Sequence, residues 1–303
     1  MLQPDSQLYT PCTEMSVVQM PPNGALSGPY ECELRIGDGI NVDIQQIIGR
    51  RIDITATPPR PCFEVFNSFQ DFETLLMLFD GMFYPIEKII FEDGREENTV
   101  KFSGIVEELL AKRLNFFESR DFCMNGFLSL LQFQDVLTEE RFHKWINLRK
   151  QLDIAYSVFM YSLSDSKMPV DTNFAFLVEL AEPFVELLKE NSGFYQELSP
   201  GEKGTSLKKC ISAIIGDFGK DIFSKEMNGD YESFLRTTVD SRVRIMHIKK
   251  NQPRHFSGKD CVRYSMKFSL LYRRILLDLL DVPYESYIAR IRHAVQVIDE
   301  WLK

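Results

Sequence analysis

The sequence predicts an α+β protein in which a small β-rich N-terminal module precedes an all-α helical bundle. Short β-type runs separated by turn residues fill the first hundred residues, and longer apolar patterns with helical spacing follow. The chain has 303 residues, of which 44% are hydrophobic, enough for one large or two modest domains. We expect three parts: a β-rich sensor or regulatory module at 1–103, a helical connector at 104–169, and a helical domain at 170–303.

The first elements are predicted from turn residues and local composition. Residues 1–30 are rich in Pro, Gly and Ser, which indicates an irregular or partly extended lead-in. Three β-type runs follow, separated by Gly-Asp-Gly and Pro-Pro-Arg-Pro turns: Tyr30–Ile36, Arg51–Thr57 and Cys62–Phe66. The Gly37-Asp-Gly39 segment is interpreted as a turn and not as a phosphate loop, because no Gly-Lys-Ser/Thr signature follows it.

A helix and a strand pair complete the predicted N-terminal module. Ser68 is the expected N-cap of a short helix, Phe69–Phe79, which Asp80-Gly81 closes. A further strand, Phe83–Glu92, is expected to pair with Thr99–Phe102.

The rest of the chain is predicted to be helical. Helical spacing begins at Ile105–Phe116, and Thr138 opens a long run that continues through Tyr156. Five further helices, each bounded by Gly, Asn, Asp or Pro, are expected to form one bundle: Phe174–Lys189, Thr205–Lys225, Tyr231–Lys250, Gly258–Leu280 and Tyr284–Leu302.

Cysteine usage and hydropathy narrow the class of protein. Six cysteines are scattered without a Cys-x-x-Cys pair, which argues against a zinc site and a disulfide framework: Cys12, Cys32, Cys62, Cys123, Cys210 and Cys261. The N-terminus lacks a basic stretch followed by an apolar core, and no apolar run reaches the roughly 18 residues of a membrane span. We therefore expect a cytoplasmic protein that needs neither a membrane nor a metal or other cofactor.

One segment is basic although the chain as a whole carries a net charge of −9. Residues 241–259 contain two histidines, no Asp or Glu, and six cations: Arg242, Arg244, Lys249, Lys250, Arg254 and Lys259. On charge alone, a directed anion site and a solvated loop flank stay equally open.

Within this segment, Arg242 and His247 are five residues apart on the predicted helix Tyr231–Lys250, about 7.5 Å along its axis. Histidine transfers protons near neutral pH, and arginine holds a phosphate whose charge grows in a transition state, so the pair suits RNA cleavage without a metal. The same spacing is compatible with an ordinary amphipathic boundary.

The predicted helix Tyr231–Lys250 is apolar on two sides. We expect one side to pack against its own bundle and the other against a second subunit. The residues are Leu235, Val239, Val243 and Met246 on one side, and Phe234, Ile245 and Ile248 on the other.

Two stretches carry a family resemblance. Ser241-Arg-Val-Arg-Ile-Met-His-Ile-Lys-Lys, followed by Lys267-Phe-Ser-Leu-Leu-Tyr-Arg-Arg-Ile-Leu-Leu-Asp-Leu-Leu280, resembles the HEPN superfamily, most closely the ApeA-like branch of bacterial anti-phage proteins. The resemblance covers 170–303, and Phe66–Leu76 with Phe83–Ile86 is similar in type to the β-rich module of that branch. It implies an HEPN-like all-α nuclease domain behind the β-rich module.

The resemblance implies a metal-independent endoribonuclease that acts as a homodimer, with one composite active site from both chains. An RNA 2′-hydroxyl would attack the adjacent phosphate, with His247 as general base or acid and Arg242 stabilising the phosphoryl charge. The other cations would position the RNA backbone: Arg244, Lys249, Lys250 and Arg254. The implied role is anti-phage defence by abortive infection, or a toxin-like shutdown of translation, under a possible phage-derived trigger.

Val243 departs from the family pattern, which commonly has Asn, Asp or His at this position. The departure is compatible with a weakened catalyst, and also with an alternative function, a non-catalytic HEPN-like dimerisation protein that binds RNA or a nucleotide. A helical scaffold for another protein is a third possibility. Other polar residues are interpreted as structural or solvated: His143, His255, His293, and the row Glu179, Glu182 and Glu186.

Overall fold

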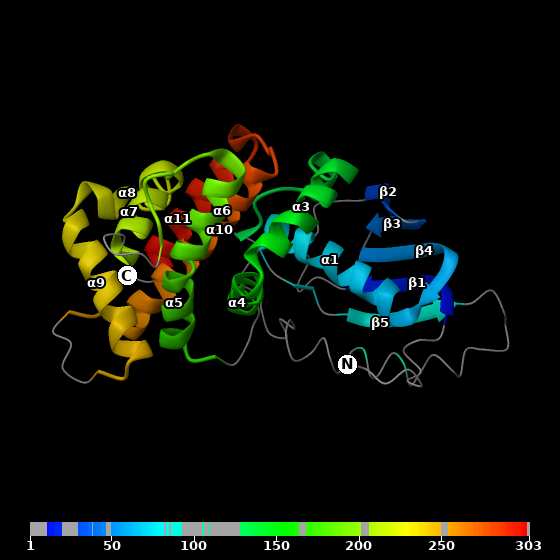
Figure 1. The fold of residues 1–303 in the computed structure, drawn as a ribbon, viewed down its shortest axis with the longest axis horizontal. Helices are drawn as coiled ribbons and strands as arrows, with labels where there is room; N and C mark the ends of the chain where they lie inside the picture. The colour runs from blue at the N-terminus through cyan, green and yellow to red at the C-terminus, as the bar shows by residue number, and fades with distance from the viewer. Residues whose placement is uncertain are drawn as a thin grey trace. The chain divides into compact units, whose positions relative to one another are not determined.

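The computed structural model describes residues 11–19, 30–37, 39–46, 50–81, 83–84, 86–92, 105, 109, 128–163, 168–200, 206–249 and 254–301. The chain forms two compact units, Met1–Ile146 and Asn147–Lys303. A sheet with a long helix characterises the first unit, and helices alone build the described part of the second (Figure 1). The fold class is α+β, as the sequence predicts.

Five strands form one antiparallel sheet among the described residues of the first unit, in the order β2-β3-β4-β1-β5. They are β1 (Pro11–Gln19), β2 (Tyr30–Gly37), β3 (Ile40–Gln46), β4 (Arg50–Pro61) and β5 (Ile86–Glu92). Alternate apolar residues of the inner strands are fully buried, as one covered face requires: Met15, Val17, Val42, Ile44, Ile52 and Ile54.

β2 and β4 confirm the strands predicted at Tyr30–Ile36 and Arg51–Thr57, and β5 confirms the second half of Phe83–Glu92. Within the lead-in predicted to be irregular or partly extended, Pro11–Gln19 is extended, and its pairing with both β4 and β5 inside the sheet was not predicted. β3 was not predicted, although its residues alternate between apolar and polar. Thr99–Phe102 lies outside the described residues, as does Ile105–Phe116 apart from Ile105 and Leu109.

The long helix α1 (Cys62–Asp80) lies across β1 and β4 (Figure 1). Its start contradicts the strand predicted at Cys62–Phe66, because the helix begins directly after Pro61, whose φ of −54° suits a helix entry. The predicted N-cap, Ser68, instead lies inside the helix and donates to the Glu64 carbonyl at 3.2 Å. The predicted end is confirmed, since Gly81 caps the helix with a φ of 79°.

The second unit is built from helices throughout its described residues. These are α3 (Glu139–Leu152, which begins in the first unit), α4 (Ile154–Leu163), α5 (Val170–Glu179), α6 (Ala181–Ser192), α7 (Leu207–Phe218), α8 (Ser224–Asn228), α9 (Tyr231–Met246), α10 (Gly258–Leu279) and α11 (Ile288–Trp301). A short 3-10 turn, η6 (Tyr284–Ser286), precedes α11.

Three predicted long helices are interrupted in the structure. The run from Thr138 to Tyr156 breaks at Asp153, which has a φ of 48°, and Phe174–Lys189 breaks at Leu180. Thr205–Lys225 ends at Gly219, where a Cβ would lie 2.8 Å from the Ile215 Cα. Apolar periodicity continues across such breaks because both halves face the same core, so spacing alone does not reveal them.

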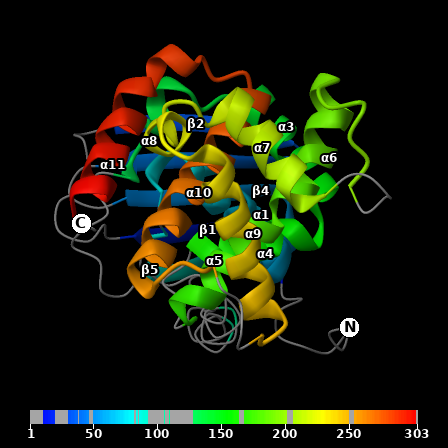
Figure 2. The same ribbon diagram turned by 90° about the vertical axis from the view of Figure 1, so that its left-hand side faces the viewer.

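α10 is the central helix of the bundle and packs against α5, α6, α7 and α11, while α9 packs against α5 (Figure 2). The Tyr272 hydroxyl of α10 donates to the Leu177 carbonyl of α5 at 2.6 Å, which fixes the two helices to each other. In the part of the chain that is described, no helix is long and apolar enough to cross a membrane.

Candidate active site on the end of helix α9

The helix that carries the Arg-x4-His motif starts at a side-chain cap. Asp230 is the N-cap of α9, and its carboxylate accepts from the Ser233 amide at 2.9 Å. Four residues at helical spacing are buried and fix which face meets the bundle: Phe234, Leu235, Thr238 and Ser241. Arg242, the first residue of the motif, comes directly after Ser241, the last of these buried residues.

The end of α9 is a Schellman arrangement. The Lys249 amide donates to the Arg244 carbonyl at 3.0 Å, and the Ile248 amide donates to the Ile245 carbonyl at 3.3 Å. Ile248 takes the left-handed conformation, with a φ of 51°, at the position where glycine is usual. The prediction that the helix continues to Lys250 is therefore wrong, since it ends at Met246 with His247 as its C-cap.

His247 stands at the exposed end of this helix. Its side chain is exposed, and the imidazole has no hydrogen bond, ion pair or ring contact among the described residues, whereas its amide donates to the Val243 carbonyl at 3.1 Å. The position leaves His247 accessible to a substrate or to a second chain.

Arg242 is held by a carboxylate from another helix. Its guanidinium forms an ion pair with Glu179 at the end of α5, and the two side chains are 21% and 30% exposed. Burial lowers the pKa of Arg242 from its ordinary value. The prediction that Glu179 belongs to a solvated face is wrong, because its charge is used in this pair.

The predicted RNA-binding cations fall into two groups. Arg254 is paired with Asp240 at 3.1 Å, so its charge is largely compensated. Arg244 and Lys249 have no ion pair or side-chain hydrogen bond among the described residues. Lys250 lies outside the described residues. Uncompensated positive charge is thus found at Arg244 and Lys249, close to His247 in sequence.

An apolar edge accompanies these charges. Met246 is 38% exposed and Ile248 is 85% exposed. Val239 and Val243, further back along the same helix, are partly exposed. Both predicted apolar sides are thus buried near the start of the helix, at Leu235 and Phe234, and exposed near its end, at Met246 and Ile248.

The segment that begins at residue 254 lies beside α9 and packs against it. The Phe256 amide donates to the Ser241 hydroxyl at 2.8 Å, and Ser241 in turn donates to the Thr237 carbonyl at 2.7 Å. The Phe256 ring lies 4.5 Å from the ring of Tyr264 and 5.7 Å from that of Phe174. These contacts hold the segment that carries His255, predicted to be a loop residue, beside the motif helix.

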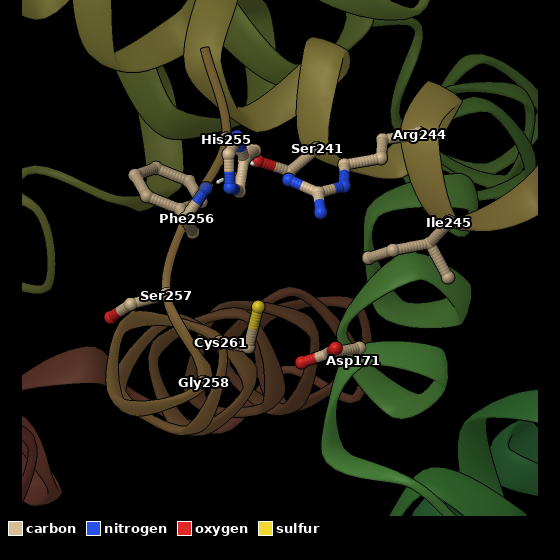
Figure 3. Close-up of a pocket in the computed structure, with 9 residues that line it drawn as sticks. All are labelled: Asp171, Ser241, Arg244, Ile245, His255, Phe256, Ser257, Gly258 and Cys261. Atoms are coloured by element: carbon tan, nitrogen blue, oxygen red, sulfur yellow. Dashed lines mark hydrogen bonds between the residues drawn. The ribbon is translucent and has the colours of Figure 1, made fainter. Parts of the chain in front are cut away.

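A pocket of about 240 Å³ lies between this segment, α5, α9 and the start of α10 (Figure 3). Arg244 and His255 lie along one side, and the carboxylate of Asp171 lies opposite (Figure 3). Polar and small residues dominate its lining: Asp171, Ser241, Arg244, His255, Gly258 and Cys261. Arg242 and His247 are not among the lining residues.

Cys261 in this pocket is unsuited to act as a nucleophile. Burial and the neighbouring carboxylate of Asp171 raise the pKa of the Cys261 thiol to about 12. The thiol therefore stays protonated at neutral pH. No group of three His, Cys, Asp or Glu residues with a metal-binding arrangement occurs within the described ranges.

A helical bundle in which the motif helix α9 ends on an exposed histidine is the type of domain that the structure defines. Residues 175–286 match the family model of the Apea-like HEPN domain, a stretch that runs from α5 to η6 and includes all of α9 and α10. The chain thus carries an Apea-like HEPN domain, and HEPN domains are commonly ribonucleases that often act as dimers on RNA. Neither the curated proteins nor the solved structures gave a match.

The resemblance inferred from Arg242 and His247 is confirmed by this match. Sequence reasoning missed the Glu179 partner of Arg242 and the pocket around Arg244. The signal for the pocket was weak, because Asp171 and His255 are 84 residues apart in sequence and neither belongs to a motif.

Proposed function

We propose that this protein is a metal-independent endoribonuclease. The observation that carries the proposal is the Apea-like HEPN domain, in which the Arg-x4-His motif ends on an exposed histidine. In this proposal an RNA 2′-hydroxyl attacks the adjacent phosphate, and His247 takes or gives the proton. Arg242 stabilises the charge that grows on the phosphoryl oxygens.

The ion pair with Glu179 constrains how Arg242 works in this proposal. A guanidinium has five N–H donors, so it can keep one carboxylate and still hold a phosphate oxygen. The pair also holds the guanidinium in one place before the substrate arrives, which reduces the entropy lost on binding. Arg244 and Lys249 then supply the uncompensated charge that attracts the RNA backbone.

Two chains are proposed to form one composite site. The support is the partly uncovered apolar edge around Met246 and Ile248, which lies directly beside His247. Burying this edge against its copy brings two His247 side chains toward a common interface, as a two-fold contact requires. The proposed biological role is defence by abortive infection or a toxin-like arrest of translation, with the β-rich N-terminal module, 1–103, responding to a phage-derived trigger.

A second candidate is a non-catalytic protein that dimerises and binds RNA or a nucleotide. Two observations favour it: Val243 replaces the usual polar residue, and Glu179 neutralises Arg242 in the single chain. The two candidates differ in one measurable property, because only the nuclease makes new RNA ends.

The deciding experiment incubates total cellular RNA with wild-type protein or His247→Ala in the presence of a chelator. The nuclease candidate predicts fragments with 2′,3′-cyclic phosphate ends from the wild type and intact RNA from the variant. His293→Ala, a change at an exposed histidine of α11, is the matched control and is expected to cleave like the wild type. Equal cleavage by wild type and His247→Ala would exclude His247 as the acid or base, and RNA left intact but bound would favour the second candidate.

A further inference from the structure

The pocket beside α9 has opposite charges on its two sides. The Arg244 guanidinium contributes the positive charge, beside the imidazole of His255, and Asp171 contributes a carboxylate from α5 (Figure 3). Its volume of about 240 Å³ is below the roughly 300–1,000 Å³ of pockets for drug-sized ligands. A ligand that matches it is therefore small, carries an anionic group at one end, and presents hydrogen-bond donors at the other.

Arg244 is available to such a ligand. Its neighbours Arg242 and Arg254 are each paired with a carboxylate, but the Arg244 guanidinium has no ion pair within the described part of the chain. Gly258, the first residue of the 22-residue helix α10, borders the same space. A Cβ at Gly258 would meet no atom within 4 Å, so the pocket stays open over that helix terminus.

Asp171 supplies the acceptor side. Its side chain is exposed, and its carboxylate lies on the pocket wall opposite Arg244 and His255 (Figure 3). An ionised carboxylate has about four acceptor positions, so capacity for a ligand remains. Ile245 provides an apolar surface between the two charged sides.

We propose that this pocket binds one unpaired guanine nucleotide, with its phosphate at Arg244 and His255 and its base at Asp171. Arginine binds phosphate with charge-assisted hydrogen bonds, which account for the anionic end. Guanine alone among the four RNA bases presents two adjacent N–H donors on its pairing edge, the match for the two oxygens of one carboxylate. The nucleotide comes either from single-stranded RNA, which depends on the proposed function, or from a free guanine nucleotide, which does not.

The test measures binding of guanosine, adenosine, cytidine, uridine and inosine 5′-monophosphates to the full chain by calorimetry. Inosine lacks the 2-amino group of guanine and reports directly on the second donor. Guanosine monophosphate is expected to bind about tenfold or more tightly than the others, because an unmade hydrogen bond to a charged group costs about 1.5–3 kcal/mol. Absence of guanosine monophosphate binding, or equal binding of the inosine nucleotide, would overturn the proposal.

Two variants locate the site. Arg244→Met keeps the length of the side chain, removes its charge, and is expected to weaken guanosine monophosphate binding by about tenfold or more. Asp171→Asn is expected to abolish the preference for guanine while binding of inorganic phosphate persists. Arg290→Met, at an exposed arginine of α11 that also has no ion pair in the described ranges, is the control and should bind like the wild type. Wild-type binding by Arg244→Met would also refute the assignment.

A competition experiment distinguishes single-stranded RNA from a free guanine nucleotide as the source of the bound nucleotide. A 2′-O-methyl RNA that contains guanine cannot be cleaved, and its displacement of guanosine monophosphate identifies RNA as the source. Lack of displacement identifies a free guanine nucleotide. Because His247 does not line the pocket, guanosine monophosphate binding by a protein that cuts no RNA would contradict the nuclease proposal alone. Cleavage without such binding would contradict this inference alone.

Discussion

Glu179 holds the guanidinium of Arg242 and thereby sets the charge that an incoming phosphate meets at the motif. An isolated arginine at this position would be strongly attractive to any polyanion, and pairing reduces that attraction. The residues with uncompensated charge, Arg244 and Lys249, therefore dominate the first electrostatic contact with RNA. In the proposed nuclease, Arg242 thus contributes to specific phosphate binding, whereas Arg244 and Lys249 contribute the non-specific attraction of RNA.

Replacing Glu179 by Gln frees one positive charge and is expected to strengthen RNA binding. Affinity for a 2′-O-methyl RNA should rise several-fold at low salt, and the slope of log K against log salt should steepen by about one unit. Fluorescence anisotropy across a salt series measures both. Glu186→Gln on α6, a carboxylate that is 44% exposed, is the control. An unchanged salt slope would show that Arg242 does not face the RNA.

The elements of the helical unit are joined by a buried cation. Lys267 of α10 is fully buried, and its Nζ lies 2.9 Å from Glu226 of α8 and 3.0 Å from Asp299 of α11. Two carboxylates thus share one ammonium group in the interior. Removal of that cation leaves uncompensated buried charge, which costs far more than the loss of a surface pair.

Lys267→Met is expected to lower the free energy of unfolding by about 3–5 kcal/mol. Arg236→Met removes a partner of Glu232 in a pair whose side chains are each 52% exposed, and a loss of less than about 1 kcal/mol is expected. Urea unfolding followed by circular dichroism compares the two variants. Equal losses in both would mean that the buried cation does not join α8, α10 and α11.

At the scale of the whole molecule, the family match covers part of the helical unit and leaves the β-rich unit without an assigned relative. At the end of α9, one residue has an unfavourable environment and an unfavourable backbone conformation in the single chain. Ile248 is both 85% exposed and left-handed, two properties that a β-branched apolar residue rarely combines. Contact with a second chain would explain why an isoleucine is present there.

Ile248→Asn therefore tests the proposed dimer. Asn tolerates the left-handed conformation, so the stability of the single chain should stay the same or rise by up to about 1 kcal/mol. The apolar contact between chains is lost, so the dimer should dissociate at a higher protein concentration than the wild type. Sedimentation equilibrium measures the association, and urea unfolding measures the stability. Loss of stability without a change in association would place Ile248 outside any interface.

The catalytic candidates were accessible from sequence because they lie on one helix. Arg242 and His247 are local in the chain, and the resemblance in residues 241–250 pointed to the domain that residues 175–286 match. The β-strand at Pro11–Gln19 was not accessible, because its place in the sheet depends on pairing with β4 and β5. Local composition indicates turns and propensities, whereas a strand in the interior of a sheet is stabilised by distant partners.

The sequence by itself determined the order of a β-rich module and a helical domain, the motif at Arg242 and His247, and the HEPN resemblance. Each of these depends on periodicity or on neighbours within a few residues. The tertiary structure alone decided that α9 stops at Met246, that Glu179 pairs with Arg242, and that Arg244 and Asp171 face one pocket. Ion pairs and pockets join residues from different helices, and their partners are chosen by packing of the bundle and not by spacing along the chain.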